Sequence, residues 1–122
     1  HADLSGCTVS DGLRVRFTFP EGTTLQPGKA LVVFGGGEVS QFNVTETAQI
    51  FVASGGLALT NTGDSVTLAD ARGNVLDAMS YGAEGGQNRA LTRAVDGDPE
   101  SSFQPHEGDG FSPGLRQDGS TF

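Results

Sequence analysis

The feature that most constrains this chain is the alternation of apolar and polar residues in "LRVRFTF", Leu13 to Phe19. Leu13, Val15, Phe17 and Phe19 share one phase, and arginine or threonine occupies the other. A period of two is that of a half-buried β-strand, because successive side chains point to opposite faces of a sheet. The sequence contains no apolar stripe with the spacing of an amphipathic helix. We therefore predict an all-β chain.

Short apolar segments separated by turn residues extend this pattern along the chain. Pro27-Gly28 suits a type II turn, and Arg72-Gly73-Asn74 supplies the residues that a tight hairpin needs at positive φ. Short strands at this spacing are typical of a β-sandwich. Beyond the strand at 13–19, we predict strands over residues 30–34, 49–53, 57–59, 65–70, 74–81 and 88–93.

Length and charge narrow the class of protein. The 122 residues are enough for one domain, 1–122, and the sequence "HADLSG" at the start suggests a piece of a larger protein. Fifteen acids against seven Lys and Arg give a net charge of −8, which repels nucleic acid and anionic membranes. Cys7 is the one cysteine, so no intrachain disulfide forms. No apolar run approaches the length of a membrane span.

The stretch from Leu59 to Asp77 holds acid and amide side chains among small and apolar residues: Asn61, Asp64, Asp70, Asn74 and Asp77. Asn61 and Asp64 flank a turn, where such side chains bond nearby backbone N–H groups. Asp77 falls in mid-strand, so a half-buried carboxylate there needs a backbone or arginine partner. We interpret Asn61, Asp64 and Asp77 as structural polar anchors, with Arg89 or Arg93 as the partner of Asp77.

A second acidic group lies on the glycine-containing loops after residue 95. Calcium takes six to eight oxygen ligands, which carboxylates on a bendable backbone supply. The EF-hand pattern is not met, since Ser101 stands where the loop needs glycine. The candidate calcium ligands are Asp96, Asp98, Glu100, Glu107 and Asp109. No other cofactor is predicted.

Catalytic constellations are weak in this sequence. His106 is the one histidine after His1, and no Gly-x-Ser-x-Gly nucleophile motif accompanies it, so we expect His106 on a surface loop. The glycines at 35–37 follow a predicted strand but lack the Gly-Lys-Ser/Thr of a phosphate loop. Apolar residues thin out after Ala83, and Phe103 and Phe111 are expected to anchor a long C-terminal loop. We predict that the chain is not an enzyme.

Four segments, taken in order, resemble the lamin tail domain family, whose fold is an immunoglobulin-like sandwich. They are "DLSGCTVSDG" (3–12), the strand, Pro-Gly turn and strand at 17–34, "SGGLALTNTGDSVTLADARGNVLDAMSYG" (54–82) and "FSPG" (111–114). Cys7 stands where the family often has tryptophan, and we expect it to pack as a small buried hydrophobe. The resemblance implies an antiparallel immunoglobulin-like β-sandwich.

The resemblance also implies a role. Its prokaryotic members are similar to extracellular accessory modules, so we predict a non-catalytic interaction module of a larger exported protein. The family's opening strands have no counterpart before residue 3, so we expect an exposed sheet edge that pairs with a protein partner or a second copy. The candidate binding loops are 35–49 and 96–110. The alternative is a calcium- or carbohydrate-binding module. Sandwich modules that bind sugars usually expose aromatic side chains, and this sequence has no Trp and one Tyr, which counts against carbohydrate binding.

Overall fold

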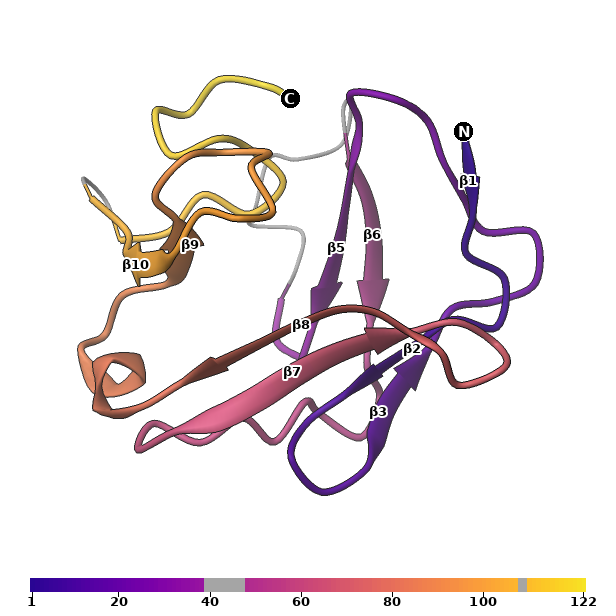
Figure 1. The fold of residues 1–122 in the computed structure, drawn as a ribbon, viewed down its shortest axis with the longest axis horizontal. Coiled ribbons are helices and arrows are strands. Elements are labelled where there is room, and N and C mark those ends of the chain that lie inside the picture. The colour runs from indigo at the N-terminus through magenta and orange to yellow at the C-terminus, as the bar shows by residue number, and fades with distance from the viewer. Residues whose placement is uncertain (39–47, 108–109) are drawn as a thin grey trace.

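The computed structural model describes residues 1–38, 48–107 and 110–122 and is built almost entirely from β-strands (Figure 1). Within these residues a short 3-10 helix, η2, follows the longest strand. The all-β prediction is confirmed. The elements are β1 (Ala2–Asp3), β2 (Thr8–Ser10), β3 (Val15–Thr18), β4 (Thr24–Leu25), β5 (Ala30–Phe34), β6 (Ala48–Val52), β7 (Asp64–Ala69), β8 (Val75–Tyr81), η2 (Ala83–Gly86), β9 (Leu91–Arg93) and β10 (Phe103–Pro105).

Four strands form the main antiparallel sheet, in the order β3-β2-β7-β8. The other described sheets have two strands each: β1-β4, β5-β6 and β9-β10. In Figure 1 the β5-β6 pair stands against the sheet near β2 and β3, and β9-β10 lies toward the other end. The predicted antiparallel pairing holds in every described sheet except β5-β6, which is parallel. A parallel pair needs a crossover of roughly a dozen residues, and the sequence between Phe34 and Ala48 is long enough for one.

The apolar core lies between the main sheet and β5-β6. Three phenylalanine rings meet there, with centroid distances of 5.1 Å for Phe17–Phe19, 5.3 Å for Phe19–Phe51 and 5.7 Å for Phe17–Phe51. Cys7 is buried beside Phe19, as expected of a small hydrophobe. The main sheet thus packs face to face on β5-β6, which confirms the predicted sandwich. The half-buried residues around this cluster are Val9, Phe17, Leu25, Leu31, Val33, Phe51 and Leu68.

A β-bulge changes the predicted face of the first long strand. Val9 pairs with Phe17 but Ser10 pairs with Val15, so Arg16 is the extra residue on β3. The bulge breaks the alternation, since two residues then oppose one. The Arg16 side chain is therefore largely buried, whereas Val15 is exposed and Leu13 is 88% exposed. The expectation that Leu13 and Val15 share the buried face of Phe17 is wrong.

The predicted strand at 57–59 is also absent, because Ala58 has φ of 53°. A positive φ places a residue outside the β region, so no ladder can run through Ala58. The left-handed conformation is strained for alanine, whose Cβ crowds the carbonyl oxygen. Leu57 and Leu59 on either side are therefore part of an irregular segment.

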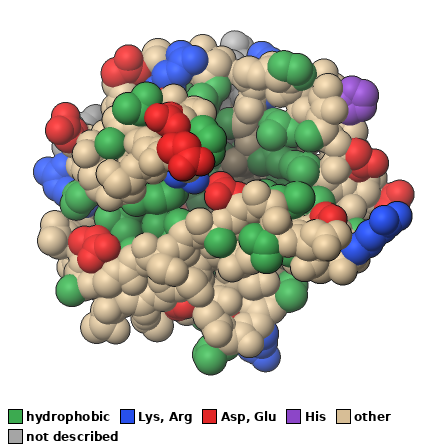
Figure 2. Space-filling view, in the orientation of Figure 1, with side chains coloured by type: hydrophobic (Ala, Val, Ile, Leu, Met, Phe, Trp, Pro, Cys, Tyr) green, Lys and Arg blue, Asp and Glu red, His purple; other side chains and the backbone are tan. Residues whose placement is uncertain are grey.

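The C-terminal part of the chain is more ordered than a plain loop. Phe103 begins β10, which pairs antiparallel with β9. Between this hairpin and the main sheet lies a hollow of about 490 Å³, lined by Val66, Met79, Leu91 and Phe103 among others. Figure 2 shows apolar side chains in recesses of the face it displays, with acidic side chains scattered around them. No helix in the described part of the chain is both long and apolar enough to span a bilayer.

Replacing Ala58 with glycine should raise the free energy of unfolding by about 0.5 to 1 kcal/mol. Glycine removes a left-handed strain of about 1 to 2 kcal/mol, partly offset by its greater backbone entropy in the unfolded chain. The matched control is Ala78→Gly in β8, which should lower the free energy of unfolding by about 0.5 to 1 kcal/mol. Denaturant titration measures both, and a destabilised Ala58→Gly variant would contradict the strain.

Candidate functional site

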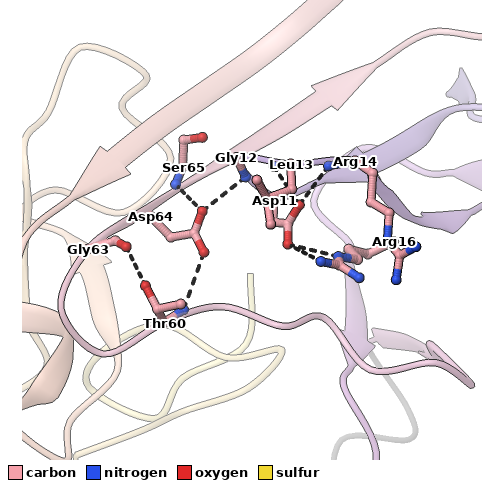
Figure 3. Close-up of polar contacts among 9 residues, drawn as sticks. All are labelled: Asp11, Gly12, Leu13, Arg14, Arg16, Thr60, Gly63, Asp64 and Ser65. Carbon is pink, nitrogen blue, oxygen red and sulfur yellow. Dashed lines mark hydrogen bonds and ion pairs between the residues drawn. The ribbon is translucent and has the colours of Figure 1, made fainter.

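Figure 3 draws two carboxylates, and Asp11 has more hydrogen-bond donors around it than Asp64 has. Asp11 is buried and accepts hydrogen bonds from the backbone N–H groups of Leu13 and Arg14, both at 2.9 Å. Its other oxygen lies 2.8 Å from Arg16 Nε and 2.7 Å from Arg16 Nη2. The Arg16 hydrogen bond, followed by the two backbone donors, lowers the pKa of Asp11 to about 2. The β3 bulge turns Arg16 inward to make this pair.

Asp64, in the neighbouring turn, likewise accepts hydrogen bonds from backbone N–H groups (Figure 3). Its Oδ1 accepts from Ser65 N at 2.8 Å and Gly12 N at 2.9 Å, and its Oδ2 accepts from Thr60 N at 3.3 Å. These N–H groups, with Ser65 first, lower the pKa of the Asp64 carboxyl. The Thr60 hydroxyl donates to the Gly63 carbonyl. Asp64 therefore ties the 11–14 turn to the turn before β7.

These two carboxylates are unsuited to proton transfer. Both are hydrogen-bonded to fixed donors in the ionised form, and the lowered pKa keeps them ionised at neutral pH. A general acid or base works best with a pKa near the operating pH and a free approach to substrate. Sequence reasoning assigned no role to Asp11. The signal available was an aspartate followed by Gly12 and by Arg16 five positions on.

Asn61 lies in the same turn as Asp64 but is exposed. The turn is held instead by Thr60, whose carbonyl accepts the Tyr81 hydroxyl at 2.7 Å. In the part of the chain that the structure describes, no side-chain hydrogen bond to the Asn61 amide is found. Its neighbour across space is Gly86, where an added Cβ would lie 3.2 Å from the Asn61 carbonyl oxygen.

Asp77 meets Arg93, one of the two predicted arginines, at 3.2 Å. The expected half-burial is wrong, because β8 is an edge strand and the Asp77 side chain is 59% exposed. Arg93 does more than pair with it. Its Nη1 donates to the carbonyls of Pro99 and Ser101 at 3.0 and 2.9 Å, and its guanidinium lies 4.6 Å from the Phe103 ring centroid. Arg93 thus connects the C-terminal hairpin to β8.

Two of the candidate calcium ligands make separate hydrogen bonds to the backbone. Asp96 accepts from Gln117 N at 3.2 Å, and Asp98 accepts from Glu100 N at 2.9 Å. Glu100 and Glu107 are exposed. Within residues 1–38, 48–107 and 110–122, no three His, Cys, Asp or Glu side chains are grouped as metal ligands. Asp109 lies outside the described residues, as does 39–47 of the candidate binding loop 35–49, so the calcium site stays a prediction.

His106 corrects the expectation of a surface histidine, since it is only 4% exposed. Its Nδ1 contacts the Glu107 carbonyl, and its Nε2 lies 2.8 Å from Ser112 Oγ. A carbonyl can only accept, so in the neutral ring Nδ1 donates and Nε2 accepts the serine proton. The backbone N–H of His106 also donates to the Ala90 carbonyl at 2.8 Å. We call this group, made of Ala90, His106, Glu107 and Ser112, the histidine clip.

Ser112, His106 and the Glu107 carbonyl lie in the order of a nucleophile, a base and an orienting acceptor. The other parts of a hydrolase site are not found beside them among the described residues. A nucleophile elbow uses the backbone N–H of the residue after the serine as an oxyanion donor. That residue is Pro113, which has no N–H. The near-complete burial of His106 also suits a structural hydrogen bond better than proton shuttling. The clip fastens the C-terminal segment to itself.

Replacing Asp11 with Asn should change how stability depends on pH. The folded-state pKa of about 2 lies below the ordinary value of 3.8, so the stabilisation is full above pH 4 and is lost as pH falls toward 2. The wild type should therefore lose more stability than Asp11→Asn between pH 4 and pH 2, although the variant is less stable at pH 7. Urea titrations across this range measure the difference, and parallel profiles would contradict the assignment.

Replacing Ser112 with Ala should cost about 1 to 3 kcal/mol in the C-terminal segment, because it leaves a buried ring nitrogen without its partner. Amide hydrogen exchange should then accelerate at residues 90 and 106. Ser102→Ala, at an exposed position, is the matched control and should leave exchange unchanged. Equal exchange in the two variants would show that the clip does not hold this segment.

The comparisons with known proteins agree with this geometry. The Lamin Tail Domain model matches residues 1–83, which include the Asp11 and Asp64 turns and the whole main sheet. The lamin tail domain is a non-catalytic family. Neither the curated proteins nor the solved structures gave a significant match. Residues 84–122, with the histidine clip, lie beyond the matched part. On the match over most of its length, the chain belongs to the lamin tail domain family.

Proposed function

We propose that this chain is a non-catalytic interaction module of a larger exported protein, and that it binds an extended segment of a partner protein along β8. The observation that carries the proposal is the free edge of β8. This strand is the longest of the described strands, pairs with β7 on one side and ends the sheet order β3-β2-β7-β8. An unpaired strand edge offers a row of backbone donors and acceptors to an added strand.

The composition of β8 supports strand addition. Val75 and Leu76 are 63% and 53% exposed, and residues 75–81 contain no proline, lysine or arginine. Proteins commonly protect edges with such residues, with bulges or with short strands. The opposite edge, β3, is more strongly protected, since it has four residues, carries the Arg16 bulge and is followed by Pro20. β8 also has a bulge, at Leu76, because Leu68 pairs with Asp77 and Ala69 pairs with Val75, but from Asp77 to Tyr81 its pairing with β7 is regular. The edge of β8 over residues 77–81 is thus the one left open for pairing.

Charge favours a different protein over a second copy. With a net charge of −8, two copies repel each other on approach, whereas a basic or neutral segment is attracted or unhindered. The acidic surface is equally unfavourable for nucleic acid. Family membership and the carboxylates committed to hydrogen bonds support a non-catalytic role for the whole chain. The proposal includes an accessory role beside another domain of the same exported protein.

Selection from a phage-displayed library of random linear peptides tests the proposal. Bound peptides should shift the amide resonances of residues 75–81, and Leu76→Lys should weaken binding by roughly tenfold through loss of an apolar contact. Thr18→Lys, on the β3 edge, is the matched control and should bind as the wild type does. Peptides that map to β3, equal binding by Leu76→Lys, or a stable homodimer across a dilution series would each overturn this assignment.

A further inference from the structure

We propose that a polar hollow beside η2 is a binding site for a neutral glycan. The hollow has a volume of about 370 Å³, within the range of small-molecule sites. Its lining comes from three separate parts of the chain: the turn before β7, the η2 segment with the residues after it, and the C-terminal segment. It includes no residue of β8, so the proposal does not rest on strand pairing. The principal lining residues are Asn61, Gly86, Asn88, Arg89 and Phe111.

Charge selects the class of ligand. None of the described lining residues is acidic, so a cation finds no counter-charge there. The net charge of −8 repels an anion, and Arg89 already donates to the His106 carbonyl and makes a further interaction. A hollow lined largely by amide and backbone groups is also a poor match for an apolar molecule. A neutral molecule rich in hydroxyl groups remains.

The lining groups match what a sugar ring presents. Asn61 and Asn88 each carry an amide oxygen that accepts and an NH₂ group that donates, and a sugar hydroxyl can answer either. Neither side-chain amide is hydrogen-bonded by another described residue. Phe111 is 56% exposed at the same hollow. Its ring face carries partial negative charge and so attracts the C–H face of a pyranose.

The hollow is held in shape before any ligand arrives. An added Cβ at Gly85 would lie 2.5 Å from the Tyr81 ring, so η2 packs on Tyr81 more closely than any side chain would allow. Asn88 has φ of 57°, a left-handed conformation that asparagine adopts more readily than most residues. The Ala90 N–H donates to the Gly110 carbonyl at 2.7 Å and fixes the C-terminal wall. Preorganisation of this kind lowers the entropic cost of binding.

The test is an NMR titration of the whole chain with four neutral oligosaccharides: cellohexaose, laminarihexaose, xylohexaose and mannohexaose. At least one should shift the amides of residues 61, 85–89 and 110–111. Phe111→Ala and Asn88→Gly should each weaken that binding by roughly tenfold, the effect of one lost ring contact or hydrogen bond. Glycine at 88 keeps the left-handed backbone while removing the amide. Phe122→Ala removes an aromatic ring that does not line this hollow and should bind normally.

Three outcomes would overturn the glycan site. One is the absence of amide shifts with all four oligosaccharides at millimolar concentration. Another is full binding by both Phe111→Ala and Asn88→Gly. The third is equal or tighter binding of polygalacturonate, because a polyanion contradicts the charge argument. Peptide binding along β8 is measured separately, so failure here leaves the interaction module untouched.

Discussion

The packing of Phe17 and Phe19 against Phe51 is the contact on which the rest of the structure depends. It is where the main sheet and β5-β6 meet, around one buried and two half-buried rings, and the described core residues gather around it. Burial of aromatic area is a large stabilising term for a chain with one cysteine and no tryptophan. The β3 strand therefore keeps Phe17 and Phe19 inward, and the bulge places Arg16 against Asp11.

Polar interactions hold the parts that this core does not reach. Asp11 and Asp64 gather backbone donors from the turns at one end of the sheet, and Arg93 collects carbonyls of the 99–101 turn while lying over Phe103. The histidine clip closes the C-terminal segment in the same way. Since β9-β10 leaves a hollow against the main sheet, the C-terminal segment is fastened mainly by hydrogen bonds rather than by apolar burial.

The structural roles of these polar side chains limit what the chain can do chemically. The carboxylates with lowered pKa values stabilise turns, so they are not available for chemistry, in keeping with a non-catalytic family. Three surfaces are available for binding: the open edge of β8, the apolar hollow under β9-β10 and the polar hollow beside η2. Surfaces of this kind suit recognition of an extended segment or a compact polar ligand.

Local pattern was enough to predict the strands at 30–34, 65–70 and 74–81 and the hairpin at Gly73, and the family resemblance led to the expected burial of Cys7. It failed where the outcome depends on neighbours distant in sequence. The bulge at Arg16 arises because Asp11 needs a cation and β2 sets the register, and the alternation of β3 alone contains neither fact. Ala58 was assigned to a strand because apolar character does not encode a positive φ.

The amino-acid sequence by itself determined the all-β class, because side-chain periodicity and turn residues act over a few positions. The resemblance of four ordered segments to the lamin tail domain indicated the family, which the match over residues 1–83 shows. Only the tertiary structure decided that β5 and β6 run parallel, that His106 is buried against Ser112, and which lining groups share a hollow. These outcomes depend on contacts between residues far apart in the chain, whose free energies exist only once the layers have packed.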